Sequence, residues 1–294
     1  MKQFIKNISL FIIGLIIITL FVLFFYRYKS NNIHINKSKN VLIMGDSHTQ
    51  SALNDSIIEN SVNISQPSEH FLYSYNVLRL LLNNNRQIKK IVLGVSFHSF
   101  GIAYDGFVKD VDKTQFMFPK YYPILNNESL RDVSLIHFND IKGIYDNIMK
   151  INFNSSINEF SFVGKYYKSN KSNLNDSSIN KALQRHYYDS LGRQQKYSVL
   201  QLKYLKKIVA LSSERNIQLI LINTPIHKTY YNQIPVKFVD NYYSIIREIG
   251  NDKVRFIDLH SYKLEERCYG DGDHLNFYGA IEISSLVNKM IKNN

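Results

Sequence analysis

The sequence predicts an α/β protein in which helices cover both faces of a parallel β-sheet. Three observations support this fold class: short and nearly continuous aliphatic runs, amphipathic segments between them, and turn residues where the runs end. Strands that are buried on both faces have this composition, and their alternation with helices is typical of a doubly wound sheet. With 45% hydrophobic and 20% charged residues, the chain can form a sizeable core.

The predicted elements alternate at both ends of the chain. We expect strands over residues 40–44 (NVLIM), 90–96 (KIVLGVS), 217–223 (IQLILIN) and 254–259. Apolar residues at helical spacing predict helices over residues 69–82, 199–213, 236–249 and 278–291. Between about residues 100 and 196 this alternation is lost, apart from one helical stretch near residues 129–151. That segment is predicted to be a long insertion over the edge or top of the sheet.

The amino-terminal segment predicts a single transmembrane helix. Residues 8–26 carry no charge, and nineteen residues at about 1.5 Å per residue span about 30 Å of hydrocarbon. A cleaved signal peptide is the alternative, but its apolar region is usually shorter, and no small-x-small site precedes residues 27–39. The sequence therefore predicts an anchor at residues 1–29, a polar tether at residues 30–39 and one globular domain at residues 40–294.

Much of the positive charge lies next to this anchor. The net charge is +12, and six basic residues fall in the first 39 positions, which contain no acid. The rest of the chain has no basic helix or aromatic-basic motif, so nucleic-acid binding is not expected. The flanking charges alone slightly favour a cytoplasmic domain. The anchor nevertheless resembles an export signal, so we expect a domain outside the cytoplasm, in the periplasm or at the cell surface.

Two distant segments carry residues suited to acyl transfer. Ser47 follows the first strand, where ligands bind in this fold class. It could simply cap a helix that begins near Ala52. However, Asp271-Gly272-Asp273-His274 places a carboxylate three residues before a histidine, in a short loop ahead of the last helix. Such a loop can direct one imidazole nitrogen toward Asp271 and the other toward Ser47, which is the arrangement of a nucleophile, its base and an orienting acid.

These two segments resemble the first and last conserved blocks of the GDSL-type, or SGNH, hydrolase superfamily. The residues that carry the resemblance are Gly45-Asp46-Ser47-His48 and Asp271-x-x-His274-Leu275-Asn276-x-x-Gly279-Ala280. The resemblance implies a flavodoxin-like SGNH hydrolase fold. It also implies Ser47 as the nucleophile, His274 as the general base and then acid, and Asp271 as the residue that orients the imidazole. With its anchor and insertion, the chain particularly resembles the extracytoplasmic branch that includes the D-alanine transfer protein and the alginate O-acetyltransferases.

The chain departs from this family at the oxyanion hole. Where the second block has a glycine, Ser65 or Gln66 would supply the N–H group, and Ser96 stands where the third block has asparagine. The expected oxyanion-hole residues are therefore Ser47, Ser65, Gln66 and Ser96. Loss of one such donor typically costs about 2.7 to 4 kcal/mol of transition-state stabilisation.

Other polar residues near these segments are expected to support the site rather than to react. We predict this role for Asp46, which can bond the backbone of its own turn, and for His48 and His98. No metal site and no cofactor are expected, because the sequence lacks paired cysteines and histidines at helical spacing. Cys268 is the only cysteine, which excludes an intramolecular disulfide.

The sequence thus favours a serine esterase or O-acyltransferase acting on cell-surface or exported polysaccharide through an acyl-serine intermediate. The acyl group is expected to be acetyl. The expected partners of the protein are the membrane, an acylated glycan or other acyl donor, and a membrane protein that transfers acyl groups. The alternative is a membrane-tethered binding or assembly module with the same fold and weak or no catalysis, an interpretation motivated by the serine at position 96.

Overall fold

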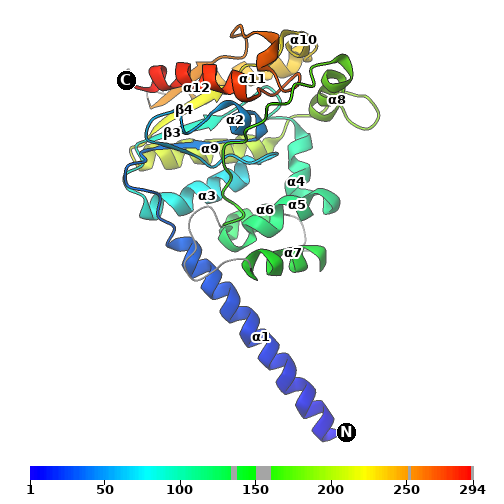
Figure 1. Ribbon diagram of the computed structural model, residues 1–294. Coiled ribbons are helices and arrows are strands. Elements are labelled where there is room, and N and C mark those ends of the chain that lie inside the picture. The colour runs from blue at the N-terminus through cyan, green and yellow to red at the C-terminus, as the bar shows by residue number, and fades with distance from the viewer. Residues whose placement is uncertain (134–137, 150–159, 251–252, 293–294) are drawn as a thin grey trace.

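The computed structural model describes residues 1–133, 138–149, 160–250 and 253–292. Within them, a sheet of five parallel strands has the order β2-β1-β3-β4-β5 (Figure 1). The strands are β1 (Val41–Met44), β2 (Ser61–Asn63), β3 (Lys90–Gly94), β4 (Gln218–Asn223) and β5 (Val254–Asp258). This order is the flavodoxin-like arrangement, so the predicted doubly wound α/β fold is confirmed.

Helices connect these strands and form the insertion. Those that cover the sheet are α2 (Ser47–Ala52), α3 (Phe71–Asn84), α9 (Val199–Glu214), α11 (Val236–Ile249) and α12 (Phe277–Lys292). The segment between β3 and β4 contains η1 (Ile102–Asp105), α4 (Gly106–Lys109), α5 (Val111–Tyr121), η2 (Tyr122–Ile124), α6 (Asn127–Asp132), α7 (Phe138–Met149) and α8 (Asp176–Tyr187). Two short elements, α10 (Lys228–Tyr231) and η4 (Glu266–Cys268), lie in the loops after β4 and β5.

Successive strand residues belong to opposite faces of the sheet. Leu42 and Ile91, paired across β1 and β3, belong to the apolar cluster formed with α3, α9 and α11. Their neighbours Ile43 and Val92 belong to a second cluster with α12, and α12 also contacts α2. Because both faces are buried, nearly every strand position is apolar, which is what made the strands recognisable in the sequence.

The four predicted strands and the helices α3, α9, α11 and α12 match their predicted ranges to within two residues. The helix expected to begin near Ala52 instead begins at Ser47 and ends at Ala52, because Asp46 caps it. The short strand β2 was not predicted, since three residues are too few for a periodic pattern. The stretch expected near residues 129–151 contains two helices, α6 and α7, and residues 134–137 and 150–151 of it lie outside the described residues.

The chain begins with a long apolar helix, α1 (Lys2–Asn31), which extends away from the domain (Figure 1). It is long and apolar enough to cross a membrane, and its most apolar window is not buried in the protein. The residues after it, assigned to a tether from the sequence, contact the domain. Ile33 and Ile35 are buried, and the side chain of Asn85 hydrogen-bonds to the backbone of both.

Candidate active site

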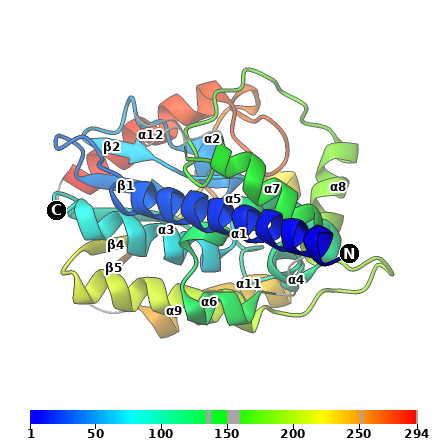
Figure 2. The same ribbon diagram turned by 90° about the horizontal axis from the view of Figure 1, so that it is seen from below.

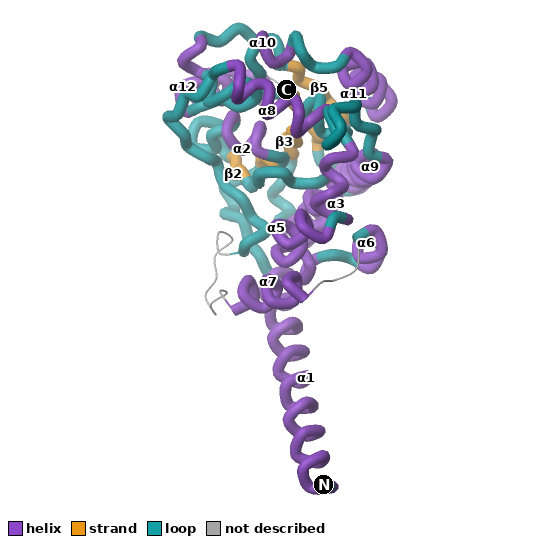
Figure 3. Tube along the Cα trace, turned by 90° about the vertical axis from the view of Figure 1, so that its right-hand side faces the viewer, coloured by secondary structure: helices purple, strands orange, loops and turns teal. Residues whose placement is uncertain are grey.

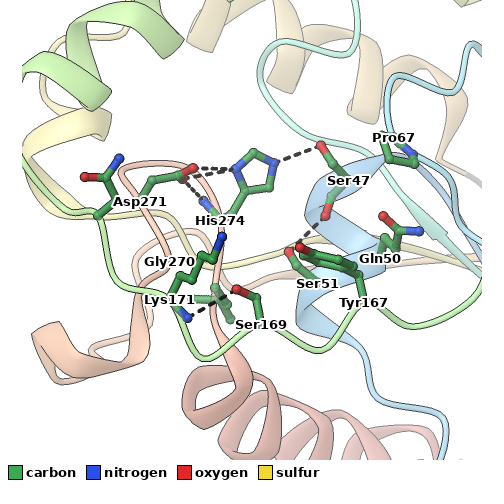
Figure 4. Close-up of a pocket in the computed structure, with 12 residues that line it drawn as sticks. Ser47, Gln50, Ser51, Pro67, Tyr167, Ser169, Lys171, Gly270, Asp271 and His274 are labelled. Carbon is green, nitrogen blue, oxygen red and sulfur yellow. Dashed lines mark hydrogen bonds and ion pairs between the residues drawn. The ribbon is translucent and has the colours of Figure 1, made fainter. Parts of the chain in front are cut away.

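Three side chains from opposite ends of the chain meet at the carboxyl edge of the sheet. The Oγ of Ser47 lies 2.8 Å from Nε2 of His274 (Figure 4). On the other side of the ring, Nδ1 of His274 lies 3.0 and 3.2 Å from the two carboxylate oxygens of Asp271. A nucleophile, a base and an orienting carboxylate are thus in hydrogen-bond contact, as acyl transfer through serine requires.

A tight turn after β1 places Ser47 at the first position of α2. Gly45 in this turn has a φ of +147°, which residues with a side chain rarely adopt. Asp46 then caps α2 by accepting a hydrogen bond of 3.0 Å from the backbone N–H of His48. Since β1 ends at Met44, the turn sets the Ser47 hydroxyl directly beyond the end of the strand.

The loop before α12 holds Asp271 and His274 in their relative positions. Oδ1 of Asp271 accepts hydrogen bonds from the backbone N–H groups of Asp273, at 3.1 Å, and His274, at 2.8 Å. The N–H of Gly270 donates to the carbonyl of His274 at 2.8 Å. The carboxylate of Asp271 is therefore held by the backbone as well as by the imidazole that it orients.

A second carboxylate, that of Asp273, lies beside the imidazole of His274. Its side chain is 1% exposed, and its Oδ1 is 3.4 Å from Nδ1 of His274. Burial opposes the charged imidazolium, but the charge of Asp273 and the hydrogen bond to Asp271 outweigh it and raise the pKa of His274 to about 10. At neutral pH the ring is therefore mostly protonated, and His274 becomes a base as the pH rises toward that value.

Buried histidines extend this polar network behind the site. Asp273 also contacts Nε2 of His48, at 3.3 Å, and Nδ1 of His186, at 3.6 Å. Next to them, Nε2 of His98 lies 2.9 Å from Oδ2 of Asp46. Burial favours the uncharged acid of Asp46, but the hydrogen bond and the positive charge of the histidines outweigh it, so its pKa lies well below 3.8. Asp46, His48 and His98, predicted to support the site, thus lie directly behind the Ser47 turn.

The candidate oxyanion-hole residues are not equally available. Ser47 lies in the first turn of α2, where the helix itself supplies no acceptor for a backbone N–H. The backbone N–H groups of Ser65, Gln66 and Ser96 are bonded within the protein. They donate to Asn63 Oδ1 (2.9 Å), Gly45 O (3.0 Å) and Ser99 Oγ (2.9 Å), respectively. As placed, the N–H groups of Ser65 and Gln66 cannot serve an oxyanion, because their hydrogen bonds are already used. At Ser96 the expected donor is the hydroxyl, which stands in place of the asparagine amide, and not this N–H.

A pocket of about 360 Å³ opens beside Ser47 and His274. One wall is residues 164–175 of the insertion, here called the strap, which contributes Tyr167, Ser169, Lys171 and Asn173 (Figure 4). Four backbone hydrogen bonds fix the strap across the sheet edge. They join Gly164 N to Ile64 O, Tyr167 N to Gln50 O, Phe277 N to Ser169 O and Asn173 N to Gly270 O. The insertion therefore helps to form the wall of the pocket.

Among the described residues, two groups of side chains each bring three metal-ligand atoms within 4.8 Å of one another. The first group is His48, His98 and His186, and the second is His48, Asp273 and His274. In the first group the rings of His98 and His186 stack, with centroids 4.2 Å apart and planes at 16°. A metal ion binds in the plane of each imidazole at about 2.1 Å, which two stacked rings cannot both allow. In the second group, both ring nitrogens of His274 already face Ser47 and Asp271. These donor sets fit hydrogen bonding better than metal binding.

Three residues of this site have no catalytic or supporting role predicted from the sequence: Asp273, His186 and Lys171. Asp273 belongs to the same segment as Asp271, so a second carboxylate beside the histidine was a signal that could have been used. His186 and Lys171 lie far from both motifs along the chain. No spacing rule could have placed them here, because α8 and the strap reach the site only through tertiary contacts.

One protein-family model matches residues 169–294, which include Asp271 and His274 but amount to less than half of the chain. No curated protein matches the sequence.

Among solved structures, a Streptococcus pneumoniae protein described as a platelet activating factor is 13% identical, with a TM-score of 0.47, and the match covers 97% of this chain and 98% of that one. A GDSL-like lipase from Bacteroides thetaiotaomicron is 9% identical, with a TM-score of 0.43 and coverage of 92% and 97%. An acylhydrolase from Bacteroides fragilis is 10% identical, with a TM-score of 0.40 and coverage of 91% and 94%. At these scores the likeness assigns neither a family nor an activity.

Proposed function

We propose that this protein is a serine esterase or O-acyltransferase of the SGNH type that works through an acyl-serine intermediate. The observation that carries the proposal is the contact of 2.8 Å between Ser47 Oγ and His274 Nε2, with Asp271 bonded to the opposite nitrogen. Hydrogen-bond contact between a nucleophile and an oriented base is the geometric requirement for this chemistry. The motifs that contain these residues support the same assignment.

The chemistry proceeds in two half-reactions. Ser47 Oγ attacks the acyl carbonyl while Nε2 of His274 takes the hydroxyl proton, and the N–H of Ser47 faces the developing oxyanion. Collapse of the tetrahedral intermediate breaks the bond to the leaving oxygen, which receives the proton from Nε2. Water or a sugar hydroxyl then attacks the acyl-serine, gives its proton to His274, and the proton returns to Ser47. Asp271 holds Nδ1–H throughout and stabilises the imidazolium.

The proposed substrate is an O-acylated polysaccharide, with acetyl as the expected acyl group, outside the cytoplasm. The apolar helix α1 supports attachment to a membrane, and the resemblance of the anchored chain to extracytoplasmic acyltransferases supports an exported glycan. In the pocket, Tyr167 is 57% exposed, and its ring offers a face on which a sugar ring can stack. A membrane protein that supplies the acyl group is the proposed partner.

A fluorophosphonate probe tests the nucleophile, because it labels an activated serine and ignores an inert one. The full chain is incubated with the probe over pH 7 to about pH 10, the range in which His274 loses its proton. We expect labelling of the parent protein and none of Ser47→Ala. Ser169→Ala is the matched control, since Ser169 lines the same pocket and its Oγ accepts only from the backbone N–H of Lys171 in the described contacts. That variant should label like the parent.

Two results would contradict this proposal. Labelling that persists in Ser47→Ala would place the nucleophile elsewhere. A folded parent protein that is not labelled at any pH would favour the tethered binding module, an interpretation that the internally bonded N–H groups of Ser65 and Gln66 also support. If labelling occurs, an acetyl ester incubated with and without a sugar acceptor separates transfer from hydrolysis, because only transfer yields an acetylated sugar by mass spectrometry.

A further inference from the structure

The last apolar turns of α1 pack directly against the globular domain. Val22 and Leu23 contact the main apolar cluster, and Tyr26 is 1% exposed, with its ring 6.1 Å from that of Phe160. The uncharged run of the helix ends at Tyr26. Val22 lies four residues earlier, about 6 Å deeper along the helix axis. If α1 crosses a bilayer, the underside of the domain therefore reaches the boundary between the headgroups and the acyl chains.

Helix α7 lies at this underside. Views from the side and from below place it beside α1, at the end of the domain from which α1 emerges (Figures 1, 2 and 3). One face of α7 is held by the domain: Ile144 is 8% exposed, and a Cβ at Gly143 would lie 2.9 Å from the ring of Pro119 in α5. The position of α7 is thus fixed by close packing against α5 as well as by its contact with α1.

The apolar face of α7 is wider than the part that the domain covers. Ile141 and Tyr145, one turn apart, are 56% and 57% exposed. They lie beside the buried Ile144, whereas Lys142 and Asp146 occupy the opposite, polar side of the helix. Large apolar side chains next to a polar face, at the depth of the bilayer boundary, are typical of a helix that lies in the membrane interface.

We propose that α7 is an interfacial membrane helix, with Ile141 and Tyr145 inserted among the lipid headgroups and upper acyl chains. Together with α1 it gives the domain two points of attachment, which fixes the tilt of the active site relative to the membrane. Interfacial helices bury their apolar face about 5 to 10 Å into this region, which agrees with the depth of about 6 Å at which the domain meets α1. The inference rests on the proposed membrane anchor and is independent of the ester chemistry.

The chain contains no tryptophan, so a single introduced tryptophan reports on its own surroundings. Full-length Ile141→Trp and Tyr145→Trp are reconstituted in nanodiscs of phosphatidylcholine with or without bromine on the acyl chains. Ile17→Trp, in the middle of α1, is the positive control. Val236→Trp is the negative control, because Val236 is 72% exposed and begins α11, at the end of the domain away from α1 (Figure 1).

We expect bromine to quench Ile141→Trp and Tyr145→Trp at least roughly half as strongly as Ile17→Trp, with little effect on Val236→Trp. Quenching of Ile17→Trp without quenching at either α7 position would overturn the proposal. A blue-shifted but unquenched emission at Ile141→Trp would show that protein, such as a second copy, covers α7 instead of lipid. If Ile17→Trp is not quenched, α1 does not cross the membrane, and both the anchor and the interfacial helix are disproved. Labelling of Ser47 would be unaffected by that result.

Discussion

Replacement of Asp273 by asparagine should move the pH dependence of the reaction to lower pH. His274 must be neutral to accept the Ser47 proton, and its pKa is raised to about 10. Below that value each pH unit should therefore cost the parent protein about tenfold in rate. Asparagine keeps the size of Asp273 and can still bond to His48, but it removes the buried negative charge beside the imidazole.

The structure gives the size of this effect. A unit charge 3.4 Å from the imidazolium contributes about 5 kcal/mol at an effective dielectric constant of about 20, or about 3.5 pH units. Burial opposes the charged ring, and Asp271 remains in contact with it. We therefore expect the pH at which the rate is half-maximal to be about one to three units lower in the variant than in the parent. The labelling rate at pH 7, taken as a fraction of each protein's own maximum rate at high pH, should then be at least about tenfold higher for Asp273→Asn than for the parent.

The assay is the second-order rate constant of fluorophosphonate labelling between pH 6 and about pH 10.5. Asp271→Asn is the control, because it leaves the charge of Asp273 in place and removes the group that orients the ring. The maximum labelling rate of Asp271→Asn at high pH should be lower than that of the parent by about 10³-fold or more. Near-ultraviolet circular dichroism verifies that each variant is folded. If folded Asp273→Asn has the same pH of half-maximal labelling rate as the parent, the charge of Asp273 does not set the basicity of His274, and the reasoning is refuted.

Three further predictions concern stability and the pocket wall. Asp46→Asn keeps the cap of α2 but loses the charged contact with His98, so the free energy of unfolding at pH 7 should fall by about 1.5 to 3 kcal/mol. The pKa of Asp46 is depressed in the folded protein, so its contribution to the free energy of unfolding is present above pH 3.8 and lost in more acidic solution. Urea titrations should therefore show a smaller difference in the free energy of unfolding between pH 7 and pH 3 for the variant than for the parent. An equal difference in the two proteins would contradict this reasoning. Burial raises the pKa of Glu69 from 4.5 to about 8, so its stabilising contribution is present below pH 4.5 and lost as the pH rises toward 8. Glu69→Gln should therefore be more stable than the parent at pH 7, by about 3 kcal/mol at most, and equal to it near pH 4, whereas a variant less stable at pH 7 would disprove the assignment. A Cβ at Gly164 would collide with the backbone carbonyl of Ser65. Gly164→Ala should therefore displace the strap and lower kcat/KM by about tenfold or more. Lys165 is exposed, so Lys165→Ala is the control and should leave kcat/KM unchanged.

The long apolar helix at the start of the chain and the repeating strand and helix pattern could be predicted from local sequence. Strands buried on both faces must be apolar at every position, and the helices that cover them must carry one apolar stripe. Positions such as Ile43 and Ile220 therefore indicated the sheet without any knowledge of the rest of the chain. The triad candidates Ser47, Asp271 and His274 were also local, because each stands in a short motif at the end of a strand or before a helix.

The outcome for the oxyanion hole could not be predicted in the same way. Ser65 and Gln66 have suitable backbone donors in the sequence, but in the folded chain the side chain of Asn63 and the carbonyl of Gly45 occupy them. Hydrogen bonds of this kind depend on how a loop packs, and no residue pattern in the loop specifies the acceptor. Likewise, the sequence showed an insertion rich in tyrosine and phenylalanine but not which part of it would border the pocket.

The sequence by itself determined the α/β fold class, the apolar helix at the start of the chain and the residue types able to carry out acyl transfer, because each depends on neighbours within a few positions. Only the tertiary structure decided that Ser47 and His274, 227 positions apart, are in contact, that Asp273 is buried beside the imidazole, and that α7 lies against α1. Long-range packing of the sheet, the strap and the insertion brings these groups together. The basicity of His274 then follows from buried charges whose positions no local pattern encodes.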